Sequence, residues 1–199
     1  MTTTSTVRAS KSTGTGRRAI SDVPFGQSSA VLGIPVSSLR GATGLILTAT
    51  ETAGGFNLKV ASNALYAQAE VTDNETEASV CLAQIALPAN YKAGTNLTVR
   101  LPVALVKSGS PTDNGSTIDL SVYKQAASAV GSDLVTTAAQ AFAALDTWYN
   151  KDFTVDGSGL AAGDVLTLKI TSNVIDSEAG GGTITLTMDA PKVLLSING

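Results

Sequence analysis

The chain has 199 residues, of which 43% are hydrophobic, so it is long enough for one domain with a sizeable core. Only 15% of the residues are charged, which favours a surface of Ser, Thr, Asn and Gly on strands and turns over long surface helices. No apolar run approaches the roughly 20 residues of a membrane span, and the N-terminus lacks the apolar stretch of a secretory signal. We therefore expect a soluble protein with no membrane partner.

Residues 1–43 are predicted to form a basic, Ser/Thr-rich extended arm and connector. Residues 1–21 contain four basic and no acidic residues, a charge of +4; the remainder has 9 basic and 16 acidic residues, 9 − 16 = −7. A basic arm on an acidic body favours docking on a negatively charged partner, and a flexible solubilising tail is the alternative. Specific nucleic-acid binding is not expected, because no aromatic residue for base stacking lies among these charges. The basic residues are Arg8, Lys11, Arg17 and Arg18.

Residues 44–199 form the predicted body, where apolar residues recur with a period of two. The clearest run is 97–105, whose odd-numbered residues are all Leu or Val, and this pattern predicts a long half-buried strand. Pro102 lies within the run and cannot donate a backbone hydrogen bond, so we expect a sheet edge or a bulge there. Further strands are predicted at 44–50, 56–61, 65–72, 77–87, 118–123, 148–155, 166–171, 184–188 and 193–197.

Glycine-rich turns separate these runs, and no strand–helix–strand rhythm is present. The pattern predicts an all-β fold, a single antiparallel β-sandwich that is jelly-roll-like and has about 8–10 strands. One segment, Gly131–Asp146, fits either a short helix or a strand with a long loop.

Residues for catalysis are scarce. The chain has no histidine, and its single cysteine, Cys81, lies in an apolar run and is interpreted as a packed side chain. Asp73, Glu75 and Glu77 alternate, so they form either a solvated acidic turn or a calcium site. We therefore expect a protein that is not an enzyme and that has no cofactor.

Trp148 and Tyr149 are the only adjacent aromatic residues. On a strand they point to opposite faces, so one can lie in the core while the other is exposed. An exposed aromatic ring would be a sugar platform or an interface anchor, and the alternative is that both rings pack within the fold.

Three stretches carry a resemblance to a known family: 69–77, 153–170 with its Gly159-Leu-Ala-Ala-Gly-Asp-Val-Leu-Thr-Leu-Lys-Ile170, and the closing 193–199. Together with the basic arm and the single sandwich, they resemble the head decoration (cement) proteins of tailed bacteriophages. The resemblance covers residues 65–199.

This resemblance implies a structural protein on the capsid surface of a virion, made in the host cytoplasm. It implies a jelly-roll homotrimer that binds across neighbouring subunits of the major capsid protein and stabilises the head shell. It offers no catalytic residues. Our candidates for partner contacts are the four basic arm residues and Trp148. The alternative function is a carbohydrate-binding or host-adhesion β-sandwich module.

Overall fold

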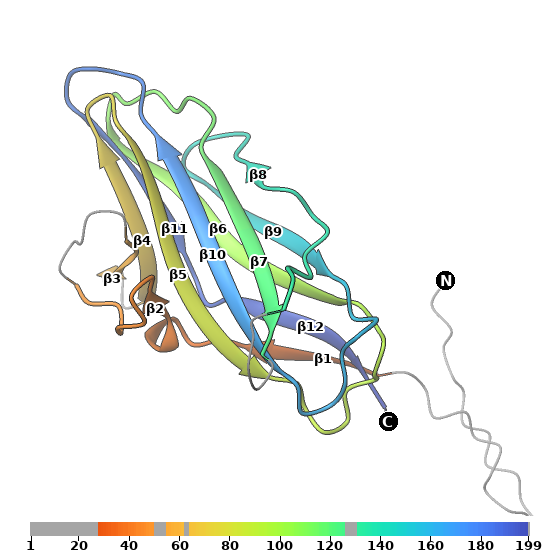
Figure 1. The fold of residues 1–199 in the computed structure, drawn as a ribbon. Helices are drawn as coiled ribbons and strands as arrows, with labels where there is room; N and C mark the ends of the chain where they lie inside the picture. The colour runs from red at the N-terminus through yellow and green to blue at the C-terminus, as the bar shows by residue number, and fades with distance from the viewer. Residues whose placement is uncertain (1–27, 50–54, 62–63, 126–130, 199) are drawn as a thin grey trace, which may run out of the picture.

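Figure 1 shows the computed structural model of the chain, which describes residues 28–49, 55–61, 64–125 and 131–198. These residues form two antiparallel β-sheets and one short 3-10 helix, η1 (Val36–Ser38). No helix in the described ranges is long and apolar enough to cross a membrane.

The larger sheet, here sheet A, is built around β6 (Leu97–Gly109). β9 (Thr147–Val155) pairs with β6 on one side. On the other side β11 and β12 follow one another, because β11 pairs with 103–109 of β6 and β12 with 98–100. The remaining strands of sheet A are β11 (Gly182–Met188), β12 (Lys192–Ile197), β4 (Ala64–Thr72) beside β11, β1 (Ser28–Gly33) beside β12, and β3 (Asn57–Ala61) beside β4.

The smaller sheet, sheet B, has the strand order β2-β5-β10-β7-β8. Its members are β2 (Arg40–Gly41), β5 (Thr76–Ala86), β10 (Val165–Ile175), β7 (Thr117–Lys124) and β8 (Gln140–Ala141). Consecutive strands from β4 to β7, and again from β9 to β11, alternate between the two sheets. This alternation gives the jelly-roll-like sandwich that the sequence predicted, with all strands antiparallel.

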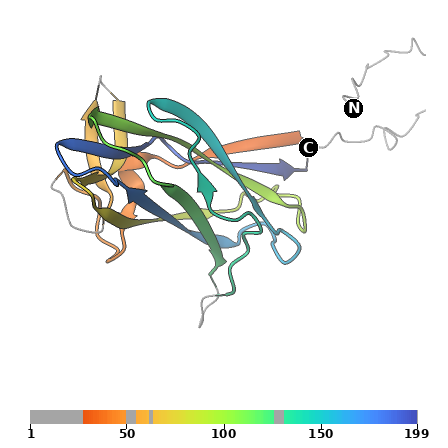
Figure 2. The same ribbon diagram turned by 90° about the horizontal axis from the view of Figure 1, so that it is seen from above.

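The period-two pattern of the sequence has a direct structural cause. Inward-facing residues such as Leu101 of β6, Phe153 of β9 and Ile170 of β10 are fully buried between the sheets. Burial of each such side chain stabilises the fold by roughly 1.5–3 kcal/mol. Figure 2 shows β1 and β12 running side by side, so the described chain begins beside the strand on which it ends.

Of the two alternatives predicted at Pro102, the sheet edge is wrong, because β6 is a central strand. The carbonyl of Pro102 accepts a hydrogen bond from Asp189 N (2.9 Å), in the turn between β11 and β12. The N–H and C=O of a strand residue point to the same side. The N–H that proline lacks would therefore point toward the turn between β11 and β12, where the neighbouring strand is itself interrupted.

Two other segments differ from their predicted form. Residues 44–49 make only an isolated bridge between Ile46 and Arg40, because a turn at Gly44 (φ 81°) leaves Leu45 and Ile46 exposed. Residues 131–146 contain no helix and fit the alternative of a strand with a long loop: β8 (Gln140–Ala141) pairs with β7, and Val135 forms an isolated bridge with Val155. Residues 28–43, which we assigned to the connector, supply β1, β2 and the buried side chains of Ile34, Val36 and Leu39.

The irregular segment 131–146 covers the free edge of β9. Thr136 N donates to Thr154 O (3.0 Å), and Thr154 N donates to the Thr137 hydroxyl (2.9 Å). Lys151 Nζ points inward at this edge, where it lies 5.1 Å from the ring centroid of Phe142 and donates to Ala141 O (2.6 Å). Burial lowers the pKa of Lys151. A covered edge carrying an inward charge resists pairing with another sheet.

Candidate functional site

An aromatic pair lies on the outer face of sheet A. Phe153 and Val155 of β9 point into the core, so Trp148 points outward, and 51% of its surface is exposed. Tyr66 of β4 lies on the same face and is half-buried. We call this surface the aromatic face and define it by five residues: Tyr66, Gln68, Ala104, Trp148 and Thr187.

The two rings reach each other across the sheet. β4 and β9 are separated by β11 and β6, so their backbones lie about 14 Å apart. The ring centroids of Tyr66 and Trp148 are nevertheless only 5.8 Å apart, with an interplanar angle of 40°. Both side chains must therefore lean toward one another over the intervening strands, which makes a low, broad apolar platform.

Small residues under the rings make this arrangement possible. The strand register places Trp148 opposite Ala104, Ala104 opposite Thr187, and Thr187 opposite Gln68. Ala104 is 1% exposed and Thr187 is 5% exposed, although both face away from the core. Gln68 Nε2 donates to the Thr187 hydroxyl (3.0 Å), which satisfies this buried group.

Polar groups surround the platform on neighbouring positions of the same face. Arg100 of β6 and Asp152 of β9 form two 2.7 Å hydrogen bonds, and the hydrogen bond to Asp152 raises the pKa of the guanidinium. On the other side the Thr185 hydroxyl donates to Glu70 Oε2 (3.1 Å). Asn150, exposed on β9, faces the same way as Trp148. The face thus combines stacking surface with donors and acceptors.

The predicted opposite facing of the two adjacent aromatic residues is confirmed. Tyr149 points inward and contacts Phe142 edge-on, with ring centroids 6.1 Å apart, whereas Trp148 is half exposed. Sequence reasoning missed Tyr66. Its alternation with Gln68 and Glu70 marks it as outward-facing, but its contact with Trp148 depends on a strand order that the sequence does not reveal.

The other predicted candidates do not join this face. Arg8, Lys11, Arg17 and Arg18 lie outside the described residues, so capsid binding through the arm stays a prediction. Cys81 is fully buried, which raises the pKa of its thiol. Among the described residues no three His, Cys, Asp or Glu side chains converge to hold a metal, and Asp73 instead accepts a hydrogen bond from Gly181 N (2.9 Å).

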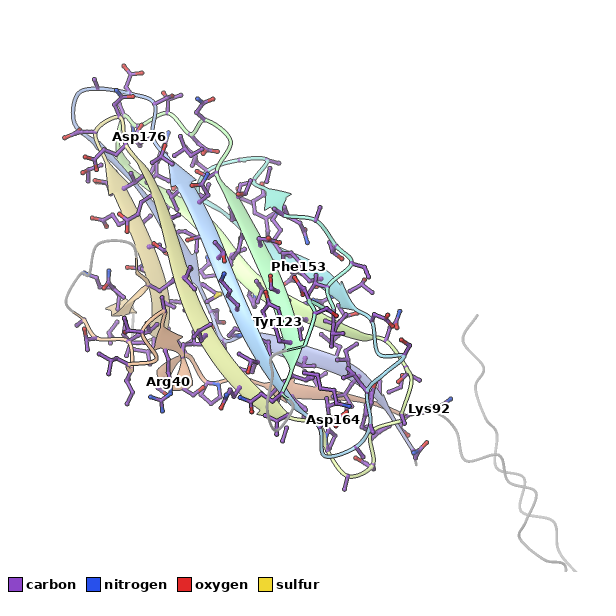
Figure 3. All side chains as sticks on the ribbon, in the orientation of Figure 1. Arg40, Lys92, Tyr123, Phe153, Asp164 and Asp176 are labelled. Atoms are coloured by element: carbon purple, nitrogen blue, oxygen red, sulfur yellow. The ribbon has the colours of Figure 1, made fainter. Side chains whose placement is uncertain are left out.

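Sheet B offers a different outer surface. Tyr123 of β7 and Arg40 of β2 lie near its opposite sides (Figure 3). Arg40 borders a shallow hollow of about 370 Å³ that Ser38, Gln84 and Thr167 also line. No aromatic ring lines this hollow. The aromatic face is therefore the stronger candidate for ligand binding.

No family model and no curated protein matches this chain. Solved structures similar to it include a protein from a study of carbohydrate-binding modules of the β-sandwich superfamily (15% identity, TM-score 0.41). That match covers 90% of this chain, and the chain spans 60% of that protein. Another is the K1 cleaved adhesin domain of Lys-gingipain from Porphyromonas gingivalis (14% identity, TM-score 0.39, 86% and 99% covered). A third is a carbohydrate-binding module in complex with β-1,4-galactotriose (13% identity, TM-score 0.36, 86% and 88% covered). The likeness concerns the fold.

Proposed function

We propose that this protein is a carbohydrate-binding β-sandwich that holds its ligand on the aromatic face without chemical turnover. The observation that carries the proposal is the half-exposed Trp148, which meets Tyr66 over a floor of small residues. This function is the alternative that the sequence left beside capsid decoration.

The physical reason is the mixed character of a sugar. A pyranose ring has an apolar face of C–H groups and a rim of hydroxyl groups, so it needs a flat apolar surface and nearby polar partners. Aromatic rings supply the surface at little cost in conformational entropy, and a few placed polar groups fix the orientation. Trp148 and Tyr66 provide the surface.

The polar groups beside the rings suit hydroxyl recognition. Asn150 offers both a donor and an acceptor, and the carboxylates of Asp152 and Glu70 retain acceptor capacity beyond their present hydrogen bonds. Because Arg100 and Asp152 already neutralise one another, they present hydrogen-bonding atoms rather than an unbalanced charge. We therefore expect neutral sugars to be preferred over strongly charged ones.

The test is a glycan array with the full chain, followed by calorimetry on the strongest ligand. Trp148→Ala is expected to weaken binding at least tenfold, which corresponds to about 1.4 kcal/mol. Tyr66→Ala is expected to weaken it less, because Tyr66 is the more buried ring. The matched control is Tyr123→Ala, which removes a half-buried ring from the outer face of sheet B and should leave binding unchanged.

Thermal unfolding of each variant separates a binding effect from a folding effect. The proposal fails if the folded wild-type chain binds nothing on a broad array. It also fails if Trp148→Ala binds the glycan as tightly as the wild type does.

A further inference from the structure

Three loops meet at one end of the sandwich, the upper end in Figure 1. They are residues 73–75 between β4 and β5, 110–116 between β6 and β7, and 176–181 between β10 and β11. We call them the acidic loop end, because they contain five carboxylates and no Lys or Arg. The carboxylates belong to Asp73, Glu75, Asp113, Asp176 and Glu178.

Hydrogen bonds hold these loops against one another. Asp176 N donates to Glu75 O (2.9 Å), and Ser177 N donates to Thr112 O (2.9 Å). Gly181 N donates to the Asp73 carboxylate (2.9 Å), and Asp113 and Asp176 form an isolated bridge. These contacts therefore hold the backbones of the three acidic loops against one another at this end of the sandwich.

Asp176 lies at the centre of this arrangement and is only 2% exposed. Its Oδ1 accepts hydrogen bonds from Thr112 N (3.1 Å) and Glu178 N (3.0 Å). Its Oδ2 is buried and has no hydrogen-bond partner. Among the described residues no Lys or Arg forms an ion pair with it. A buried carboxylate oxygen without a partner is costly, so its environment must neutralise or hydrate it.

We propose that the acidic loop end binds a calcium ion through Oδ2 of Asp176. Calcium takes roughly six to eight oxygen ligands from carboxylates, backbone and amide carbonyls and water, and the buried carboxylate of Asp176 would be the charged one among them. Since no three acidic side chains converge on one point in the described chain, the other ligands are expected to be neutral oxygens. The ion would also offset the repulsion among the surrounding carboxylates. Bound calcium would thereby fasten three connections between the two sheets.

The test measures the thermal midpoint of the full chain after treatment with a chelator. Calcium chloride is compared with sodium chloride at equal ionic strength, because salt alone screens the repulsion between exposed carboxylates. Saturating calcium is expected to raise Tm by about 5 °C more than sodium does, since a ligand that binds only the folded state stabilises it. Equilibrium dialysis should find one calcium ion per chain.

Asp176→Asn keeps an oxygen that can accept from Thr112 N but removes the charge, and it is expected to abolish the calcium response. If that variant does not fold, Asp113→Asn takes its place and is expected to weaken calcium binding severalfold, because one neighbouring charge is lost. The matched control is Asp189→Asn, in the exposed turn between β11 and β12. An equal Tm in calcium and sodium would overturn the proposal, as would a full calcium response in folded Asp176→Asn.

Discussion

The outer faces of the two sheets are built on different plans. On sheet A, Ala104 and Thr187 face away from the core yet are almost completely buried, because Trp148 and Tyr66 lie over them. On sheet B the outward residues of β5, β7 and β10 are all partly exposed, and no described ring covers its neighbours to the same degree.

Sheet B thus has an ordinary solvent-exposed outer face, whereas the outer face of sheet A carries a packed aromatic platform. The central rows of sheet B pair Leu82 with Lys169 and Lys169 with Ser121, side chains that shield one another only partly. Sheet A places its two largest outward rings over two of its smallest outward residues. The difference in size between the rings and the residues beneath them creates the platform. Substitutions on sheet A should disturb this arrangement, and matched substitutions on sheet B should have little effect because sheet B lacks it.

The largest effect on stability is expected from filling the floor of the aromatic face. Ala104→Leu forces a bulky side chain under the rings and should lower the free energy of unfolding by about 1–3 kcal/mol. Ser121→Leu makes a similar change on the open face of sheet B and should stay within about 0.5 kcal/mol of the wild type. Urea denaturation measures both. Trp148 is the only tryptophan, so a red-shifted emission in Ala104→Leu alone would show that the ring was lifted. Equal effects of the two variants would contradict the comparison.

A smaller effect is expected from the hydrogen bond beneath the rings. Gln68→Ala removes the donor to the Thr187 hydroxyl, which is buried, so the free energy of unfolding should fall by about 1 kcal/mol. Gln84→Ala removes an exposed amide from sheet B and should change stability little. The difference between their urea midpoints is the measurement. If Gln84→Ala lowers the free energy of unfolding as much as Gln68→Ala does, burial under the aromatic pair does not determine the size of the effect.

The sandwich could be predicted from sequence because its signal is local. Burial alternates along β6 and β10 with the same period as the hydrophobic residues, so the strands and their inward faces were predictable. Pro102 was misassigned because the gap that accommodates it is formed by the turn at Asp189, far along the chain. The predicted strand is absent from the described residues 44–49 for a local reason, because the turn at Gly44 interrupts a run whose apolar residues are typical of a strand.

The candidate site was only half predictable. Trp148 was identified as a candidate because the alternation of side chains along a strand is enough to place it on the opposite face from Tyr149. Tyr66 and the floor residue Ala104 were not identified, because they meet Trp148 through strand pairings that no local pattern encodes. The burial of Asp176 was not predictable for the same reason, because it comes from the convergence of three loops.

The smallest effect on stability is expected from removing the ion pair at the rim of sheet B. Lys124 Nζ lies 2.7 Å from Oδ2 of Asp164, and this hydrogen bond lowers the pKa of Asp164 below its ordinary value of 3.8. Because the folded value is the lower one, the ionised carboxylate favours folding. Its contribution is complete above pH 3.8 and is lost as the pH falls through the folded value. Both side chains remain partly exposed to solvent, so we expect the pair to contribute less than about 1 kcal/mol.

Asp164→Asn should therefore unfold at a lower urea concentration than the wild type at neutral pH, and the two midpoints should converge in acid. Lys124→Met removes the partner and should shrink the same difference, although Ala161 N still donates to the carboxylate (2.7 Å). A gap between wild type and Asp164→Asn that persists at the lowest pH would show that packing, rather than charge, makes this contact. In that case sheet B would carry a structured rim of its own, and its contrast with the aromatic face would be confined to the central strands.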